Sequence, residues 1–390
     1  MHLLHTLTVL AMTTLITATY NSTALPTEDI FYIGTGNDTL HTAGFDPLTG
    51  DSRLLSTVSG VGQASWQQLS HSGKTLYSID EAGARFEVFS ISSDGSLKRK
   101  QELPTITGAV SIAVSGDDKE IFLAHYMGNA VTYLTVDEGG NVTMAKNWTF
   151  TAPPGPKMPN QDKPHPHQVL YDPSGKWVIV PDLGADLIRV FTSTGEVDQL
   201  KMEPGSGPRH GVFHDGYYYL VSELVSTVTV FKVETTEKKF GLKKLQTIPT
   251  LPDEMRNTAA AAEILVTDDG RFVYVSNRLE KMFKDGNAIT GFSRNETGLL
   301  APMSPQQYFP SMVQTPRHVS LWPRKGQGYF VAEGQDGGGV VVFKRDAKGG
   351  AILNAESSLQ VTQPMCVTWR PKGEAKAGKK EGKRRARRGM

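Results

Sequence analysis

A short pattern of apolar and polar positions recurs six times along the chain. Each copy begins with a polar turn that contains Gly or a charged residue, continues as a strand of alternating apolar residues, and ends on a polar residue. The copies occupy residues 72–81, 117–126, 173–183, 214–224, 268–278 and 324–334. Alternation with a period of two is typical of β-strands, whereas a helix repeats about every 3.6 residues. The pattern therefore predicts an all-β protein built from repeats.

The spacing of the copies indicates which kind of repeat they form. Equivalent positions lie 45, 57, 40, 55 and 55 residues apart, at Tyr77, Phe122, Ile179, Tyr219, Tyr274 and Tyr329. One four-stranded blade of a β-propeller takes roughly 40–50 residues, and insertions lengthen it. Another strand precedes each copy, as in ASWQQLS, and a third follows several of them, as in TVTVFKV. The spacing thus predicts antiparallel blades of four strands each.

The two ends of the chain supply the missing part of a ring. PMCVTWRP (364–371) resembles a first strand without a follower, and DIFYIGTGND (29–38) resembles a second strand without a leader. Pairing them would close the ring and hide the sheet edges that an open propeller exposes. We therefore expect a seven-bladed β-propeller over residues 29–371, with the last blade closed by the N- and C-terminal strands.

Composition and charge fit one globular domain with distinctive ends. Of the 390 residues, 38% are hydrophobic and 21% are charged, which is ordinary for a soluble globular protein. The formal net charge is +1, but residues 371–390 hold nine Lys/Arg and two Glu (+7), which leaves −6 for the rest. The mildly acidic body argues against nucleic acid as the main partner. The basic segment 372–390 is predicted to be a disordered tail.

The first residues have the features of a secretory signal peptide, predicted over residues 1–18. Residues 3–18 are uncharged, largely apolar and short for a membrane span, and cleavage could follow Ala18 or Ala24. No other stretch is long and apolar enough to span a membrane. The single cysteine, Cys366, excludes an intramolecular disulfide and is expected in the core. We therefore predict that the protein is secreted, with candidate glycosylation sites at Asn21, Asn37, Asn141, Asn147 and Asn295.

Polar residues recur where the predicted strands begin and end, so a propeller would gather them at one mouth of its central channel. They are His165, His167, Arg209, His210, Glu223, Glu263, Arg278, Arg317, His318 and Glu333, with Glu81, His125, Asp182 and Asn277 at similar positions. Arginine binds carboxylate or phosphate through its planar fork, and histidine or glutamate transfers protons. The set predicts acid–base chemistry on a small anionic substrate. Each residue could instead be structural, through bonds between strands or ion pairs across the channel.

Other catalytic motifs are absent from the sequence. It contains no P-loop, no GxSxG elbow and no HExxH zinc motif. His165, His167 and Asp182 form only a weak metal-binding pattern, so neither a metal nor a cofactor is expected.

Several segments resemble one known family, the lactonase family of seven-bladed propellers. They are PHPHQVLYDPSGKWVIVPDL, GPRHGVF, YLVSEL, AEILVTDDGRFVYVSNR and TPRHVSLWP, within a similarity that covers residues 29–371. The family includes bacterial-type 6-phosphogluconolactonases and the fungal 3-carboxy-cis,cis-muconate lactonizing enzyme. The resemblance implies a catalytic set of His167, Arg209, Glu223 and Arg278. The candidates for substrate binding are His165, His210, Glu263, Arg317 and His318.

The resemblance implies hydrolysis of a sugar-acid lactone, with 6-phosphogluconolactone the best-known substrate of the family. Arg209 and Arg278 would bind the anionic group and polarise the ring carbonyl, and Glu223 or His167 would activate water and protonate the leaving alkoxide. Two alternatives stay open. One is a cycloisomerase that closes a carboxymuconate to its lactone, and the other is a secreted, non-catalytic propeller for binding or adhesion. A monomer is expected in each case.

Overall fold

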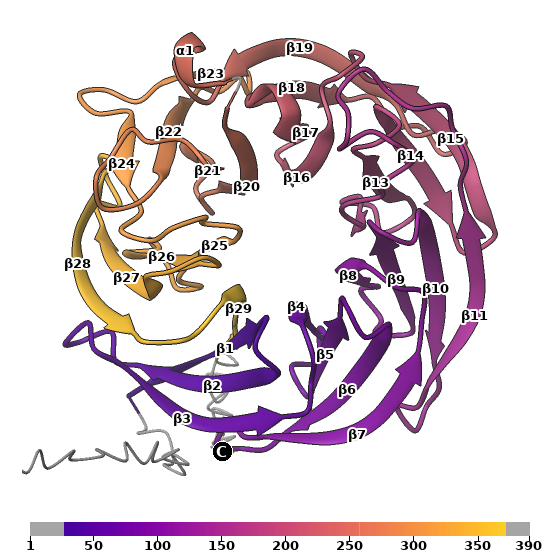
Figure 1. Ribbon diagram of the computed structural model, residues 1–390, viewed down its shortest axis with the longest axis horizontal. Coiled ribbons are helices and arrows are strands. Elements are labelled where there is room, and N and C mark those ends of the chain that lie inside the picture. Colours follow the sequence, from indigo (N-terminus) through magenta and orange to yellow (C-terminus); the bar gives the residue numbers. More distant parts are fainter. Residues whose placement is uncertain (1–26, 257, 372–390) are drawn as a thin grey trace, which may run out of the picture.

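Strands arranged as blades around a central axis make up nearly all of the regular secondary structure of the described chain (Figure 1). The computed structural model describes residues 27–256 and 258–371. Seven antiparallel sheets stand in a ring, which confirms the predicted seven-bladed β-propeller. The predicted signal peptide (1–18), the sequon at Asn21 and the basic tail (372–390) lie outside the described residues. Within the described part, no helix is long and apolar enough to cross a membrane.

Six blades are meanders in which consecutive strands pair from the axis outward. Blade 1 consists of β4 (Ala64–Leu69), β5 (Thr75–Asp80), β6 (Arg85–Ile91) and β7 (Leu97–Pro104). Blade 2 consists of β8 (Ala109–Val114), β9 (Glu120–His125), β10 (Ala130–Val136) and β11 (Val142–Thr149). Blade 3 consists of β12 (Leu170–Tyr171), β13 (Val178–Asp182), β14 (Leu187–Thr192) and β15 (Gly195–Lys201).

Blades 4 to 6 repeat this order and carry two short helical turns. Blade 4 consists of β16 (Pro208–His214), β17 (Tyr217–Ser222), η1 (Glu223–Val225), β18 (Thr227–Val233) and β19 (Leu242–Pro249). Blade 5 consists of α1 (Asp253–Arg256), β20 (Ala260–Val266), β21 (Phe272–Arg278), β22 (Ala288–Arg294), β23 (Leu300–Pro302) and β24 (Tyr308–Pro310). Blade 6 consists of β25 (Val319–Leu321), β26 (Tyr329–Gly334), β27 (Gly339–Arg345) and β28 (Ile352–Leu359).

Blade 7 joins the two ends of the chain, as the sequence predicts. Its strand order is β29 (Pro364–Trp369), β1 (Asp29–Thr35), β2 (Thr39–Phe45) and β3 (Ser52–Ser59). The pairing of β1 with β29 is antiparallel and places Phe31 opposite Trp369, with ring centroids 4.8 Å apart. Since β29 is also the innermost strand of its blade, this pairing completes both the sheet and the ring.

The repeated turn between the first and second strands accounts for the glycines of the sequence pattern. Gly73, Gly175 and Gly270 occupy this turn in blades 1, 3 and 5 with φ of +66°, +73° and +66°. Glycine adopts this left-handed conformation at little cost because it has no Cβ. Asp118 occupies the same turn in blade 2 with φ of +60°, and aspartate is among the residues that tolerate it.

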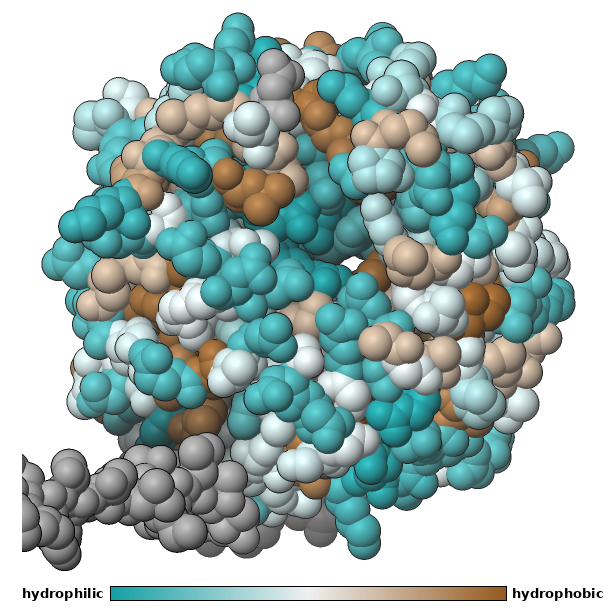
Figure 2. Space-filling model, viewed as in Figure 1, coloured by the Kyte–Doolittle hydropathy of each residue, from teal (hydrophilic) through white to brown (hydrophobic). Residues whose placement is uncertain are grey.

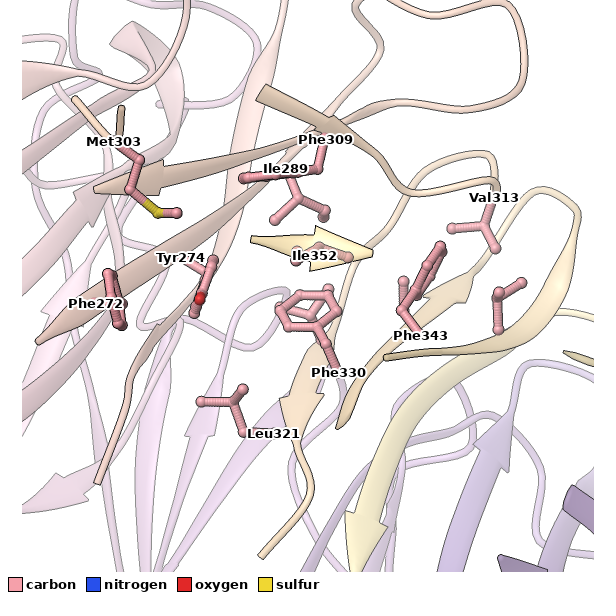
Figure 3. Close-up of a cluster of buried hydrophobic side chains, with 13 residues drawn as sticks. Phe272, Tyr274, Ile289, Met303, Phe309, Val313, Leu321, Phe330, Phe343 and Ile352 are labelled. Atoms are coloured by element: carbon pink, nitrogen blue, oxygen red, sulfur yellow. The ribbon is translucent and has the colours of Figure 1, made fainter. Parts of the chain in front are cut away.

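Apolar side chains fill the wedges between neighbouring blades. Between blades 5 and 6, Phe272 and Tyr274 of β21 pack with Phe330 of β26 and Phe343 of β27 (Figure 3). The rings of Tyr274 and Phe330 lie 5.6 Å apart. Burial of one such side chain contributes about 1.5–3 kcal/mol. Cys366 is buried as well, as expected for a core residue. This packing fixes the position of each innermost strand around the axis.

Blade 5 differs from the expected four strands because its outer position is divided. Residues 292–294 of β22 pair with β23, and residues 288–290 of the same strand pair with β24. The chain between these two short strands contains Pro305. Proline lacks the N–H that a ladder needs, so the chain leaves the sheet here and returns to it. The division lies at the circumference, away from the axis.

Candidate active site

The candidate residues share one rim of the channel because of the direction of the strands. In a meander, the start of the innermost strand lies beside the end of the second strand. Pro208 at the start of β16 pairs with Ser222 at the end of β17, and Ala260 pairs with Arg278 in blade 5. The polar residues that begin and end these strands therefore lie together. The centre of the ring is hollowed, with hydrophilic residues around the hollow (Figure 2).

A β-bulge modifies the start of the innermost strand in both of these blades. The register of β16 shifts by one residue between Pro208 and Gly211, and that of β20 shifts between Ala261 and Ile264. A bulge adds one residue to a strand and changes the direction of the side chains there. The residues inside the two bulges are Arg209, His210, Ala262 and Glu263. Three of these four are candidates from the sequence.

Two arginines share the carboxylate of Glu223 at this rim. Oε2 of Glu223 lies 2.8 Å from Nε of Arg209 and 2.8 Å from Nη2 of Arg278. Nη1 of Arg209 also donates to the carbonyl oxygen of Ala262 in blade 5 at 2.7 Å. The side chain of Arg209 is 1% exposed, and those of Glu223 and Arg278 are 15% exposed. We call these three residues the arginine clamp.

The charges of the arginine clamp suit an anionic ligand. Burial would raise the pKa of Glu223, but Arg278 and Arg209 outweigh it and lower that pKa, so the group is a carboxylate. Burial and the neighbouring Arg278 lower the pKa of Arg209 to about 9, which leaves it protonated at neutral pH. Two positive groups and one negative group give the clamp one net positive charge. An anion bound there would meet guanidinium groups that are already desolvated.

Neutral histidines lie beside the arginine clamp. Nδ1 of His167 lies 3.1 Å from Nε2 of His210, and Nδ1 of His210 lies 3.1 Å from Oε2 of Glu263. Burial lowers the pKa of His167 well below its usual value, and the positive charge of Arg209 acts in the same direction. Burial also lowers the pKa of His210, and it lowers that of His318 to about 4. At neutral pH these rings are uncharged.

A narrow pocket on the axis brings residues of opposite blades together. His167, Arg209 and His210 line it from one side, and Arg317 and His318 line it from the other. Arg317 also pairs with Glu81 of blade 1 at 3.0 Å, and the backbone N–H of His318 donates to Glu333 at 2.6 Å. The ion pair between Arg317 and Glu81 is one of the structural roles that the sequence left open.

His165 and Asp182, in contrast, are engaged in local structure. The ring nitrogens of His165 contact the carbonyl oxygen of Tyr126 at 2.8 Å and the carboxylate of Asp162 at 2.7 Å. Asp182 accepts hydrogen bonds from the backbone N–H of His165 and from Arg189. Among the described residues, no group of three or more His, Cys, Asp or Glu is arranged to hold a metal ion. His125 and Asn277 likewise bond to neighbouring side chains, Thr132 and Thr250 respectively.

Sequence reasoning missed four residues at the site. Trp66 reaches the axis from blade 1, and its ring lies 5.4 Å from those of His210 and His318 at nearly right angles to both. Trp66 occupies the position in its repeat that His210 and Glu263 occupy in theirs, and an aligned set of repeats would have revealed it. The other three are Val110 and Met365, which line the pocket, and Tyr126, whose ring lies 5.4 Å from that of His167.

The fold and the site together define a seven-bladed β-propeller with a charged, histidine-containing site on its axis. Residues 30–369 match the sequence model of the family described as "Lactonase, 7-bladed beta-propeller". The chain therefore belongs to the lactonase family of seven-bladed β-propellers, which confirms the resemblance noted in the sequence.

Curated relatives are similar over most of the chain. The protein named "Probable 6-phosphogluconolactonase" of Arthroderma benhamiae is 34% identical, over 88% of this chain and 89% of the relative. The 6-phosphogluconolactonase of Bacillus subtilis is 28% identical, over 87% of this chain and 98% of the relative. Among solved structures, the periplasmic gluconolactonase PpgL of Pseudomonas aeruginosa superposes with a TM-score of 0.78 at 22% identity, over 88% of this chain and 99% of that one. This last likeness shows the shared fold.

The arginine clamp generates a prediction about stability. Replacement of Glu223 by alanine leaves the buried Arg209 and the partly buried Arg278 without their common carboxylate, and we expect the free energy of unfolding to fall by on the order of 3 kcal/mol at pH 7. The folded-state pKa of Glu223 is lowered, so its contribution is present above the unfolded pKa of roughly 4.3 and is lost as the pH falls through the folded value. Thermal unfolding from pH 3 to 7 should therefore show the largest difference near neutrality.

Glu102→Ala is the matched control, because this exposed glutamate contacts Arg85 at 3.5 Å on the outside of blade 1. Such a surface pair contributes about 0–1 kcal/mol. Equal unfolding temperatures for Glu223→Ala and Glu102→Ala at pH 7 would contradict the prediction.

Proposed function

We propose that this protein hydrolyses a sugar-acid lactone and that 6-phosphogluconolactone is its substrate. The observation that carries the proposal is the arginine clamp beside the neutral ring of His167, in a chain that belongs to the lactonase family. The names of the relatives from Arthroderma benhamiae and Bacillus subtilis support the same substrate.

The arginine clamp provides the binding part of the reaction. Its net positive charge favours an anionic substrate, and guanidinium groups can donate two parallel hydrogen bonds to an oxyanion. Glu223 holds both guanidinium groups in place through its 2.8 Å contacts. Arg278 is more exposed than Arg209, so Arg278 is the better placed of the two to contact the substrate directly.

We assign the role of general base to His167 rather than to Glu223, because the carboxylate of Glu223 is paired with two guanidinium groups. The two arginines lower the pKa of Glu223, and a carboxylate stabilised in this way has little tendency to take up a proton. His167 is neutral because burial lowers its pKa, so a ring nitrogen has a lone pair available at neutral pH. The imidazolium formed by proton uptake is disfavoured by the same burial and returns the proton readily.

The hydrolysis then proceeds in two balanced steps. His167 takes a proton from water while the water oxygen bonds to the lactone carbonyl carbon, and the carbonyl oxygen becomes an oxyanion stabilised by Arg278 and Arg209. The tetrahedral intermediate collapses by breaking the bond between the carbonyl carbon and the ring oxygen. His167 transfers its proton to that ring oxygen, which gives the open hydroxy acid and restores the neutral ring.

We further propose that the protein is exported and glycosylated. The apolar residues 3–18 and the five sequons support this proposal. The four sequon asparagines within the described residues are exposed, namely Asn37, Asn141, Asn147 and Asn295. Exposure is required for a glycan because the modified amide must extend into solvent.

The first prediction of the proposed function concerns Arg278. Arg278→Ala removes a donor to the oxyanion, and we expect kcat/KM for 6-phosphogluconolactone to fall by about 10²–10³-fold. The measurement is formation of 6-phosphogluconate, corrected for spontaneous hydrolysis. Arg271→Ala is the matched control, because this exposed arginine lies in the turn between β20 and β21, at the opposite end of β21 from Arg278. Wild-type protein that leaves the spontaneous rate unchanged, across a panel of sugar lactones, would overturn the proposal.

A second prediction concerns pH. His167 must be unprotonated to act as a base, and Arg209, His210, Arg317 and Arg278 all add to burial in lowering its pKa. Because a lowered pKa keeps the base active in more acidic solution, kcat/KM should stay on its plateau down to a pH below 6.5. The profile is measured between pH 4 and 7.5, where spontaneous hydrolysis is slow enough to subtract. An acidic limb centred at or above pH 6.5 would contradict the role of His167.

A third prediction concerns export. Expressed in a eukaryotic host, the mature chain should appear in the medium without residues 1–18 and with glycans on exposed sequons. Mass spectrometry before and after enzymatic removal of N-glycans measures both. A chain that keeps Met1 and carries no glycan would show that the protein is not exported.

A further inference from the structure

Three buried side chains from adjacent blades, Glu263, His210 and His167, form a hydrogen-bonded series that ends on His167, which we call the relay. Nδ1 of His167 in blade 3 lies 3.1 Å from Nε2 of His210 in blade 4. Nδ1 of His210 lies 3.2 and 3.1 Å from the two carboxyl oxygens of Glu263 in blade 5. Within the described ranges, Nε2 of His167 has no hydrogen-bond partner. The relay thus runs from a carboxylate to an imidazole ring with one free nitrogen.

The positions of the protons in the relay follow from the ionisation state of Glu263. Burial would raise its pKa, but His210 and the hydrogen bond to it lower that pKa to about 2, so the carboxylate can only accept. Nδ1 of His210 must therefore carry a proton. Burial lowers the pKa of His210, so the ring is neutral and its Nε2 has a lone pair. That lone pair requires a donor, which can only be the Nδ1–H of His167.

Neighbouring residues hold Glu263 and His210 in this arrangement. The backbone N–H of Val367 donates to Nδ1 of His318 at 3.3 Å, so the proton of this neutral ring lies on Nε2, 3.8 Å from Glu263. Trp66 packs edge-on against both His210 and His318, at 5.4 Å from each ring. The indole leaves little room for either imidazole to rotate.

We propose that His210 and Glu263 are positioning residues that hold His167 as its Nδ1–H tautomer, with Nε2 free to accept a proton. The proposal rests on the hydrolysis proposed above, in which His167 is the base. In water the Nε2–H form of a neutral histidine predominates, and that form would place a proton where the base needs a lone pair. The hydrogen bond on one ring nitrogen decides which nitrogen carries the proton.

The relay also stabilises the positive charge that forms on His167 during the reaction. When Nε2 of His167 takes a proton from water, the ring becomes an imidazolium whose Nδ1–H still donates to His210. The negative charge of Glu263 then acts through His210 on the imidazolium, and no proton has to reach the carboxylate. His210 and Glu263 contribute in this way without contact with the substrate.

This role differs from the substrate binding that the sequence predicts for His210 and Glu263. Both ring nitrogens of His210 are used by His167 and Glu263. Oε1 of Glu263 also accepts a hydrogen bond from the backbone N–H of Ile264 at 3.0 Å. The polar atoms of both residues thus face protein groups.

The direct test is the tautomer of His167 in the intact wild-type protein. Nitrogen-15 NMR of histidine-labelled protein distinguishes a protonated from an unprotonated ring nitrogen at pH 7. We expect His167, assigned by the loss of its signals in His167→Gln, to be protonated on Nδ1. An Nε2–H tautomer would overturn the proposal whether or not the protein hydrolyses lactones, so this result is separate from a failure of the proposed function.

His210→Phe tests the consequence for catalysis. Phenylalanine keeps the aromatic packing against Trp66 but cannot accept from Nδ1–H of His167, so the tautomer should change to Nε2–H. We expect kcat for 6-phosphogluconolactone to fall by about 10–100-fold with little change in KM. His214→Phe, at the other end of the same strand, is the matched control. If folded His210→Phe kept both its kcat and the tautomer of His167, the result would contradict the role of the relay but not the proposed hydrolysis.

Glu263→Gln separates the charge of the relay from its shape. Glutamine has nearly the same volume but no negative charge to stabilise the imidazolium of His167. We expect the acidic limb of the kcat profile to move to lower pH and kcat to decrease. A purely structural role for Glu263 would leave the position of that limb unchanged, and an unshifted limb with normal kcat would count against the proposal.

Discussion

The antiparallel pairing of β1 with β29 is the interaction on which the rest of the structure depends. It joins the two ends of the described chain in one blade and thereby closes the ring. The site at the axis draws side chains from all seven blades, since Val110 of blade 2 and Met365 of blade 7 also line the pocket. These blades keep their distances only while the ring is closed, because each is held by apolar packing against its two neighbours. Closure is therefore a condition for the site as well as for the fold.

The groups proposed for catalysis also connect the blades. Arg209 of blade 4 donates to the backbone of blade 5, and Glu223 of blade 4 pairs with Arg278 of blade 5. The contact between His167 and His210 adds a link between blades 3 and 4. Buried charges are costly unless they are paired and hydrogen-bonded, so the site places each charge against an opposite one. The pairing of Glu223 with two arginines satisfies this need and leaves one positive charge for a substrate.

The repeats made the fold largely predictable. The turn glycines, the alternating strands and the complementary ends all indicated a closed seven-bladed ring, and the structure has it. The divided outer strand of blade 5 was not foreseen, because the two short pieces give no periodic signal in the sequence. The position of the site was also predictable, since strand ends at the axis converge by topology. Trp66 was missed because, within one strand, an axial tryptophan looks like a core residue.

By itself, the sequence determined the all-β class, the ring, the family and the kinds of residue at the rim, because these depend on local periodicity and on segments within single blades. Only the tertiary structure decided how these residues divide their roles. His165 and His167 lie two positions apart, yet one bonds to its own loop and the other faces the axial pocket. Glu223 and Glu263 both lie at the axial site, yet one holds two arginines and the other a histidine. The physical reason is that burial, charge and hydrogen-bond partners come from neighbouring blades, which are far apart in the chain.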